Sequence, residues 1–262
     1  MQHTMWSERP SPLECGPREL PGREDCDWLR ATGAVDLWWA DLDDPAGAGP
    51  SVWATLAPAE RARADRLQDR RNRQRALARR AGLRRLLGGY LGCDPAGLEL
   101  RTGRWGKPRI APTGGGLGFN LASAGRSAIY ALAWGRAVGV DVEGAADGGG
   151  EAPLARLFAS ADEQRTLARH APTSGPTAVV ALWTRKEALA KAIGAGLTLP
   201  LEELEIGTEA ARESPLLHGS WRRFAAPWRV APVPATSGRV AALAAEGGWT
   251  RIRIRRFGGA LP

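Results

Sequence analysis

The sequence predicts an α+β protein built from two α/β halves that meet near residue 138. Its 262 residues suffice for one large domain or two modest ones. Hydrophobic residues make up 44% and charged residues 24%, which is ordinary for a folded globular protein and excludes disorder over the whole chain. Short strand-like segments surround helical segments on both sides of residue 138. We therefore expect an N-terminal half at 34–138 and a C-terminal half at 139–262.

The elements expected before residue 138 follow from apolar periodicity and turn residues. Residues 1–33 are rich in Pro, Gly, Glu and Arg without periodicity, which predicts a poorly ordered extension. A helix should begin at Pro58, run to about Leu87, and be weakened or ended by Gly88 and Gly89. Strands are expected at 35–42, 98–103, 118–122 and 128–134, and a glycine-rich connecting loop at 113–118.

After residue 138 the pattern changes to a strand, two helices and further strands. The apolar run 137–144 predicts a buried strand followed by a loop. Two separate helices are expected, at 160–170 and 177–194, with Gly194 and Gly196 closing the second one. Strands are then expected at 228–233, 238–245 and 250–257.

The positive charge is concentrated in one segment. The net charge is +8, yet residues 61–85 alone contain eleven arginines against two aspartates. Such a segment can bind nucleic acid, anionic lipid, a phosphorylated ligand or an acidic protein. Arginine outnumbers lysine 33 to three, so Lys107, Lys186 and Lys191 mark positions where a compact ammonium is wanted, unless they survive by chance.

The cysteines and histidines form no pattern typical of a zinc site or of an activated nucleophile. The three cysteines are widely spaced, which predicts unpaired thiols in a reducing cytoplasm. The N-terminal residues contain no apolar core of the signal-peptide type, and no run of about 18 apolar residues predicts a membrane span. Zinc-enzyme and serine-hydrolase functions therefore find no support.

Asp141 and Glu143 lie two residues apart on the predicted strand 137–144. Both carboxylates then project from one face, about 6.5–7 Å apart along the chain. Neighbouring acids repel each other unless a cation joins them, and a hard divalent ion such as Mg²⁺ is the natural partner of oxygen ligands. The alternative is an edge strand with one solvated face.

Trp183, Glu187 and Lys191 recur every four residues and so share one face of the predicted helix. One interpretation is an ordinary surface salt bridge between Glu187 and Lys191. The other makes Glu187 a third metal ligand or a base, and Lys191 a cation for a phosphate oxygen.

Four segments together resemble the motifs of 4′-phosphopantetheinyl transferases, in the order and spacing of the larger, two-lobed type that activates peptide and polyketide synthases of secondary metabolism. They are WGKPRI at 105–110, FNLASAG at 119–125, GVDVE at 139–143 and WTRKEALAK at 183–191. The resemblance extends from about residue 35 to 250. It implies two pseudo-twofold-related α/β halves with a coenzyme A site in the cleft between them, in a cytoplasmic monomer.

The resemblance also implies a reaction of the holo-acyl-carrier-protein synthase type. The serine hydroxyl of an apo carrier protein (peptidyl, polyketide or fatty-acid type) attacks the β-phosphorus of coenzyme A, and 3′,5′-ADP leaves. Asp141, Glu143 and Glu187 would hold Mg²⁺, with Mn²⁺ equally compatible with three carboxylates. As catalytic residues, Glu187 would accept the serine proton and Lys191 would offset pyrophosphate charge.

Further coenzyme A contacts follow from the same resemblance. The 3′-phosphate would be bound by Arg63 and Arg75, with Arg61 and Arg79 nearby. The residues implied to bind coenzyme A are Arg63, Arg75, Lys107, Pro108, Asn120, Ser123, Asp141 and Lys191. This chain departs from the family at Ala122-Ser123-Ala124, where Ser-His-Ser is usual, and losing a charge-assisted contact there would cost about 1.5–3 kcal/mol of binding.

Two other functions remain as alternatives. A non-catalytic relative would bind coenzyme A or a carrier protein without turnover, and the departure at 122–124 is its only support. A nucleic-acid binder would use residues 61–85, but that segment has no interleaved aromatic residues and no known binding module. Neither nucleic acid nor a membrane is therefore expected as a partner.

Overall fold

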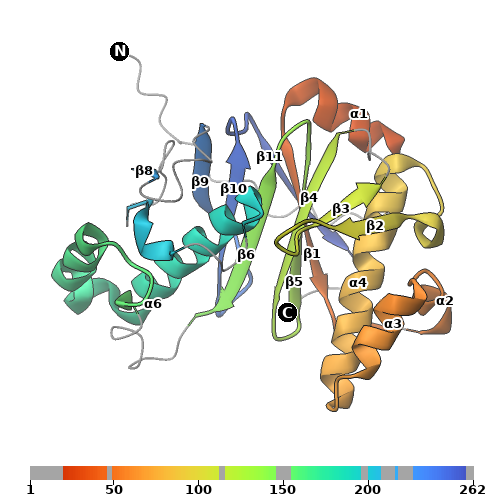
Figure 1. Cartoon of the computed structure of the whole chain (residues 1–262), viewed down its shortest axis with the longest axis horizontal. Coiled ribbons are helices and arrows are strands. Elements are labelled where there is room, and N and C mark those ends of the chain that lie inside the picture. Colours follow the sequence, from red (N-terminus) through yellow and green to blue (C-terminus); the bar gives the residue numbers. More distant parts are fainter. Residues whose placement is uncertain are drawn as a thin grey trace.

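The computed structural model describes residues 20–45, 49–111, 116–145, 155–195, 200–207, 216–217 and 227–257, apart from the side chains of 170–176 and 216–217. Figure 1 shows its layers: helices α1 and α4 on one side, two β-sheets in the middle, and helix α6 on the other side. This arrangement agrees with the predicted α+β class. Among these described residues, no helix combines the length and the apolar character needed to cross a bilayer.

The first sheet has the strand order β11-β1-β5-β4. Its strands are β11 (Ile252–Phe257), β1 (Val35–Asp41), β5 (Ser127–Trp134) and β4 (Leu117–Ala124). Strand β1 pairs antiparallel with β5 and parallel with β11. Residues 252–257 were expected in the C-terminal half, but they complete the sheet of the N-terminal half, so that part of the predicted division is wrong.

The second sheet has the order β6-β10-β9 and lies against α6. Its elements are β6 (Val138–Gly144), β10 (Arg239–Glu246), β9 (Trp228–Val233) and α6 (Ala161–Ile193). Two small hairpin-like pairs accompany the main sheets, β2 (Glu99–Thr102) with β3 (Pro108–Ala111), and β7 (Leu204–Glu205) with β8 (Leu216–Leu217). The short 3₁₀ helices are η2 (Pro95–Gly97) and η4 (Leu201–Glu203).

A shared apolar core joins the two sheets. Trp39 of β1 and Ile129 of β5 belong to the same buried cluster as Val140 and Val142 of β6 and Leu243 of β10. Because side chains alternate along a strand, this packing turns the other face of β6 toward α6. The valines thus fix the side of the sheet on which the acidic residues of β6 lie.

The helices of the N-terminal half differ from the prediction at two points. The single helix predicted from Pro58 is interrupted, giving α3 (Pro58–Asp65) and α4 (Arg70–Leu91) after the short α2 (Pro50–Trp53). The side chain of Asp69 caps α4 by accepting a 2.7 Å hydrogen bond from the Asn72 amide. Helix α4 also continues through Gly88 and Gly89, where a Cβ on Gly89 would overlap the backbone of Pro21. These glycines permit close packing instead of ending the helix.

The expectation of a poorly ordered stretch at 1–33 is wrong for its last part. Residues 23–32 form α1 (Arg23–Thr32), whose Cys26 and Leu29 are buried against the first sheet; residues 1–19 lie outside the described residues. The two helices predicted between 160 and 194 are one, α6, which ends at Gly194 with φ 75° as expected. Gly196 and residues 113–115 lie outside the described part of the chain.

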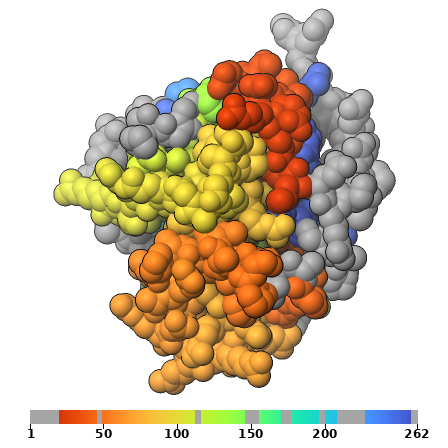
Figure 2. Space-filling model, turned by 90° about the vertical axis from the view of Figure 1, so that its right-hand side faces the viewer, coloured from red at the N-terminus to blue at the C-terminus, as the bar shows by residue number. Residues whose placement is uncertain are grey.

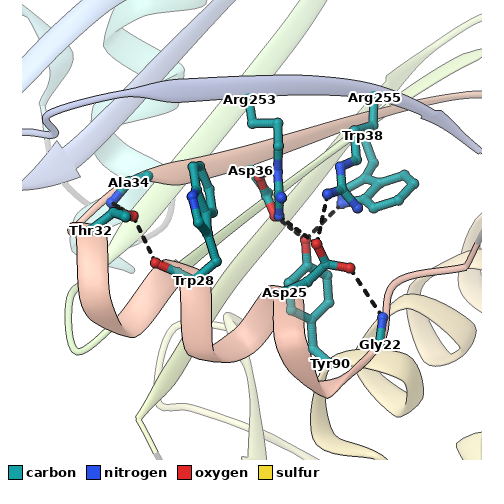
Figure 3. Close-up of polar contacts among 10 residues, drawn as sticks. All are labelled: Gly22, Asp25, Trp28, Thr32, Ala34, Asp36, Trp38, Tyr90, Arg253 and Arg255. Atoms are coloured by element: carbon teal, nitrogen blue, oxygen red, sulfur yellow. Dashed lines mark hydrogen bonds and ion pairs between the residues drawn. The ribbon is translucent and has the colours of Figure 1, made fainter. Parts of the chain in front are cut away.

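A polar network ties α1 and β11 to β1 of the first sheet (Figure 3). The fully buried Asp36 of β1 accepts hydrogen bonds from the Tyr90 hydroxyl and from Nε of Arg253, the latter at 2.7 Å. Asp25 of α1 accepts from Arg253 at 2.7 Å and from Arg255 at 2.6 Å. One network therefore connects α1, β1, α4 and the C-terminal strand β11.

Asp25→Asn should lower the free energy of unfolding at pH 7 by about 1.5–3 kcal/mol, the usual value of hydrogen bonds to charged groups. Burial acts to raise the pKa of Asp25, but hydrogen bonds from Arg255 and Gly22 and the charges of Arg255 and Arg253 bring this pKa below its usual value. Such a group stabilises the fold above its unfolded pKa of about 4, and this stability is lost as the pH falls through the folded pKa.

Urea unfolding at pH 7 and pH 3 measures this effect. The variant should show a weaker loss of stability on acidification than the parent, and Asp27→Asn, an exposed acid on the same helix, is the matched control. An acid dependence equal to the parent's in Asp25→Asn would contradict the prediction.

Candidate functional site

The candidate site forms where β6 and α6 touch. A Cβ on Gly139 would overlap the carbonyl oxygen of Ala188 and the amide nitrogen of Ala192, so the backbone of α6 lies directly on the strand. Only glycine allows this approach. The next residues of β6 that face the helix are Asp141 and Glu143.

The structure brings Asp141, Glu187 and Lys191 together from these two elements. Asp141 is only 3% exposed as a residue, and its carboxyl oxygen Oδ1 lies 2.5 Å from the Nζ atom of Lys191. The same Nζ atom lies 4.0 Å from Oε2 of Glu187. The ammonium is thus closer to the strand's acid than to the acid on its own helix.

Glu143 joins this group through Trp183, the first residue of the predicted helix face. The indole N–H of Trp183 donates to Oε1 of Glu143 at 3.2 Å. The Trp183 ring packs edge-on against Phe158, with 5.1 Å between ring centroids. Trp183 is thereby fixed and holds one oxygen of Glu143.

Burial disfavours the charged forms of all three acids, and repulsion from neighbouring acids adds to this effect for Glu143 and Glu187. Burial raises the pKa of Asp141, and the charge of Lys191 only partly offsets it. Burial and then the charge of Asp141 raise the pKa of Glu143. The pKa of Glu187 is raised by burial and, beyond the opposing effect of Lys191, by Asp141 and Glu143. The three carboxylates therefore belong to one electrostatic unit.

Two carboxylate oxygens of this unit, Oδ2 of Asp141 and Oε1 of Glu187, are buried without a hydrogen-bond partner. A hard divalent cation such as Mg²⁺ would satisfy such oxygens. Within the described ranges, however, no three His, Cys, Asp or Glu side chains form a ready-made group of metal ligands. The chemistry of the donors fits a cation, while the ammonium of Lys191 provides the positive charge beside Asp141.

The arginines that the sequence assigned to a phosphate lie on α3 and α4, which form the lower part of the face in Figure 2. Arg63 is exposed on α3. Arg75 donates from Nε and Nη2 to Asp43, at 2.7 and 2.6 Å, and so is paired with a carboxylate. Arg79 donates to the hydroxyl of Ser123 at 2.8 Å. The Arg79–Ser123 contact links the basic helix to the segment where the chain departs from the family.

Lys107 and Asn120, both expected to bind coenzyme A, contact backbone groups in this structure. Nζ of Lys107 donates to the carbonyl oxygens of Val138 at 2.9 Å and Ala192 at 2.8 Å. Oδ1 of Asn120 accepts from the Val140 amide at 2.9 Å. Both side chains therefore connect the N-terminal half to β6 or α6. Pro108, which follows Lys107 in the WGKPRI motif and was also expected to bind coenzyme A, begins β3.

Arg239 and Asp43 were missed by the sequence analysis. Arg239 begins β10, and its guanidinium lies beside both Gly125 and Gly144. Its charge acts to lower the pKa of Glu143. Periodicity marks neither residue, because each reaches its partner across a long stretch of sequence.

Comparison with known proteins identifies the family. The chain is 33% identical over 220 residues to HetI, a 4′-phosphopantetheinyl transferase of Nostoc sp., a match that covers 82% of this chain and 89% of the relative. This chain belongs to the 4′-phosphopantetheinyl transferase superfamily. The family model itself matches residues 137–243 of the transferase, which include Asp141, Glu143 and Glu187.

A second relative of the transferase is a 4′-phosphopantetheinyl transferase of Bacillus subtilis, 28% identical over 174 residues, or 66% of this chain and 76% of the relative. A phosphopantetheinyl transferase of Thraustochytrium sp. is 32% identical over 187 residues, 64% of each chain. These relatives confirm the resemblance to 4′-phosphopantetheinyl transferases that the four sequence motifs indicated.

Glu187→Gln should raise the melting temperature of the metal-free transferase at pH 7. A raised folded-state pKa means that the ionised carboxylate is less favourable in the folded than in the unfolded chain, so its charge costs stability above the unfolded pKa. Each kcal/mol regained corresponds to about 2–4 °C in a chain of this size.

Thermal unfolding in the presence of a chelator measures this change. Asp65→Asn, which removes an exposed carboxylate on α3, should stay within about 1 °C of the parent. A lower melting temperature for Glu187→Gln would show that the carboxylate supports the fold.

Proposed function

We propose that this transferase moves the 4′-phosphopantetheine group of coenzyme A to a serine hydroxyl of an apo carrier protein and releases 3′,5′-ADP. The observation that carries the proposal is the meeting of Asp141, Glu143, Glu187 and Lys191 where β6 touches α6. Phosphoryl transfer needs mainly positioning and charge neutralisation, and this group provides acids for a cation and an ammonium for a phosphate.

The three carboxylates would hold Mg²⁺ or Mn²⁺, which when bound would neutralise charge on the pyrophosphate. Two of them contribute buried oxygens that lack other partners, Oδ2 of Asp141 and Oε1 of Glu187. The indole of Trp183 donates to Oε1 of Glu143 and not to the second carboxylate oxygen, Oε2, of Glu143. The chain's own contribution is therefore a set of oriented oxygen donors.

Glu187 is the proposed general base. Burial raises the pKa of its carboxyl group, which strengthens it as a proton acceptor. The serine oxygen forms a bond to the β-phosphorus, the serine proton passes to Glu187 directly or through water, and the bond from the β-phosphorus to the bridging oxygen breaks. Lys191 would then balance negative charge on the departing 3′,5′-ADP.

The 3′-phosphate is assigned to the basic helices. Arg63 is exposed on α3, and Arg75 keeps Nη1 free of its bidentate contact with Asp43. Arg79 with Ser123 supplies a cation and a hydroxyl where the family usually has histidine. This pair supports an active enzyme despite the departure at 122–124.

Glu187→Gln should reduce carrier labelling by at least about 10²-fold, the usual contribution of a general base. The assay combines the protein with Mg²⁺, fluorescent coenzyme A and an apo carrier domain, and measures labelled carrier. Near-normal turnover of the variant would contradict the role of Glu187.

The parent protein in the same assay separates the alternative functions. Coenzyme A binding without labelling would indicate a non-catalytic relative. Neither activity, together with salt-sensitive retention of DNA or RNA, would indicate a nucleic-acid binder.

Arg63→Ala and Arg75→Ala should each raise the KM for coenzyme A about tenfold, the typical cost of a lost charge-assisted contact. The KM for 3′-dephospho-coenzyme A should stay unchanged, because it lacks the group these residues bind. Arg101→Ala, which removes an exposed arginine of β2, is the matched control. Equal effects on both substrates would refute the 3′-phosphate assignment.

A further inference from the structure

Lys107 joins three elements that are far apart in sequence. It lies in the turn between β2 and β3, and its ammonium donates to the carbonyl oxygens of Val138 and Ala192 at 2.9 and 2.8 Å. Val138 begins β6 and Ala192 precedes the last residue of α6. One side chain of the N-terminal half thus holds the strand and the helix that carry the candidate site.

The surroundings of this ammonium favour main-chain acceptors. Burial, with a smaller effect from the charge of Arg109, lowers the pKa of Lys107 to about 7. No carboxylate in the described part of the chain forms an ion pair with Lys107, while the C-terminal end of α6 offers the negative end of a helix dipole. The two carbonyl oxygens therefore offset only part of the cost of burying this charge.

The path of the Lys107 side chain is also prepared by the fold. Gly194, which ends α6 with φ 75°, would place a Cβ 3.0 Å from Cδ of Lys107. A side chain at position 194 would therefore crowd the lysine as well as strain the backbone. The glycine that ends α6 leaves room for Lys107 to reach the last turn.

The two acceptors of Lys107 flank the ion pair of the site. Ala192 follows Lys191 directly, and Val138 lies three residues before Asp141 on the same strand. Between them, Gly139 brings the two backbones into contact. A shift of the last turn of α6 relative to β6 would therefore change the distance between Lys191 and Asp141.

We infer that Lys107 is a positioning residue, which fixes the end of α6 against β6 and so sets the placement of Lys191 beside Asp141. The catalytic part of this inference rests on the proposed function. It differs from the nucleotide contact that the family resemblance implies, because two of the three N–H donors of Lys107 are engaged by the protein backbone.

Two variants of the full-length protein test the inference, Lys107→Met and Lys107→Arg, with Arg101→Met as a control at an exposed position of the same hairpin. Lys107→Met keeps a comparable chain but loses the donors. Lys107→Arg keeps the charge, but its planar fork does not reproduce a compact ammonium. The experiment measures kcat, the KM for coenzyme A, and the rate of hydrogen–deuterium exchange of the backbone amides in residues 139–142 and 190–194.

A positioning role predicts a kcat about 10–100-fold lower in Lys107→Met, as expected when reacting groups are misplaced, with a KM within about twofold of the parent's. Amide exchange in both segments should be faster, and Arg101→Met should behave like the parent. If Lys107→Met fails to fold, Lys107→Arg decides: a kcat loss with faster exchange supports the inference.

The opposite result is a tenfold rise in KM with unchanged kcat and unchanged exchange, which would make Lys107 a nucleotide ligand and overturn the inference. Hydrogen–deuterium exchange does not require catalytic turnover. It therefore tests the positioning role of Lys107 even if the parent protein shows no phosphopantetheine transfer. Unchanged exchange in an inactive protein would overturn the inference, whereas faster exchange there would support it while the proposed function fails.

Discussion

The contact between the backbones of α6 and β6 at Gly139 is the constraint on which the site depends. Glycine at this position lets the helix lie on the strand, and any side chain there would overlap Ala188 and Ala192. Because the helix is held so near, residues spaced four apart on it meet residues spaced two apart on β6. The ion pair between Lys191 and Asp141 is one result of that register.

The site weakens the protein that carries it, and the rest of the fold compensates. Burying three acids raises their pKa values and costs stability when they are ionised. The apolar core shared by both sheets contributes in the other direction, as does the buried network of Asp36, Tyr90 and Arg253. The core lies on the opposite face of β6 from the acids, and the network lies on the first sheet, so neither set of stabilising contacts uses the acidic face of β6.

Local patterns predicted the strands of the two main sheets and the acidic faces, whereas the short strands β3, β7 and β8 and the contacts between distant segments were missed. The alternation that puts Asp141 and Glu143 on one face of β6 leaves Val140 and Val142 on the other face, where the structure buries them in the core. The spacing of Trp183, Glu187 and Lys191 likewise predicted one helix face. The break before α4 was missed because Asp69, its cap, lies within an arginine-rich run that reads as continuous helix. The pairing of β11 with β1 and the acceptors of Lys107 depend on residues that no local window contains.

The position of β11 has a consequence for synthesis of the chain. Strand β1 is made early, but its parallel neighbour consists of residues 252–257, and the buried Asp36 receives its arginine partner from the same late strand. On the ribosome, the N-terminal half would therefore present an open sheet edge, and a carboxylate without its arginine partner, until residue 257 has emerged. A nascent chain of this kind would profit from a chaperone that covers that edge, and a gene divided near residue 138 would yield an N-terminal product lacking one strand of its sheet.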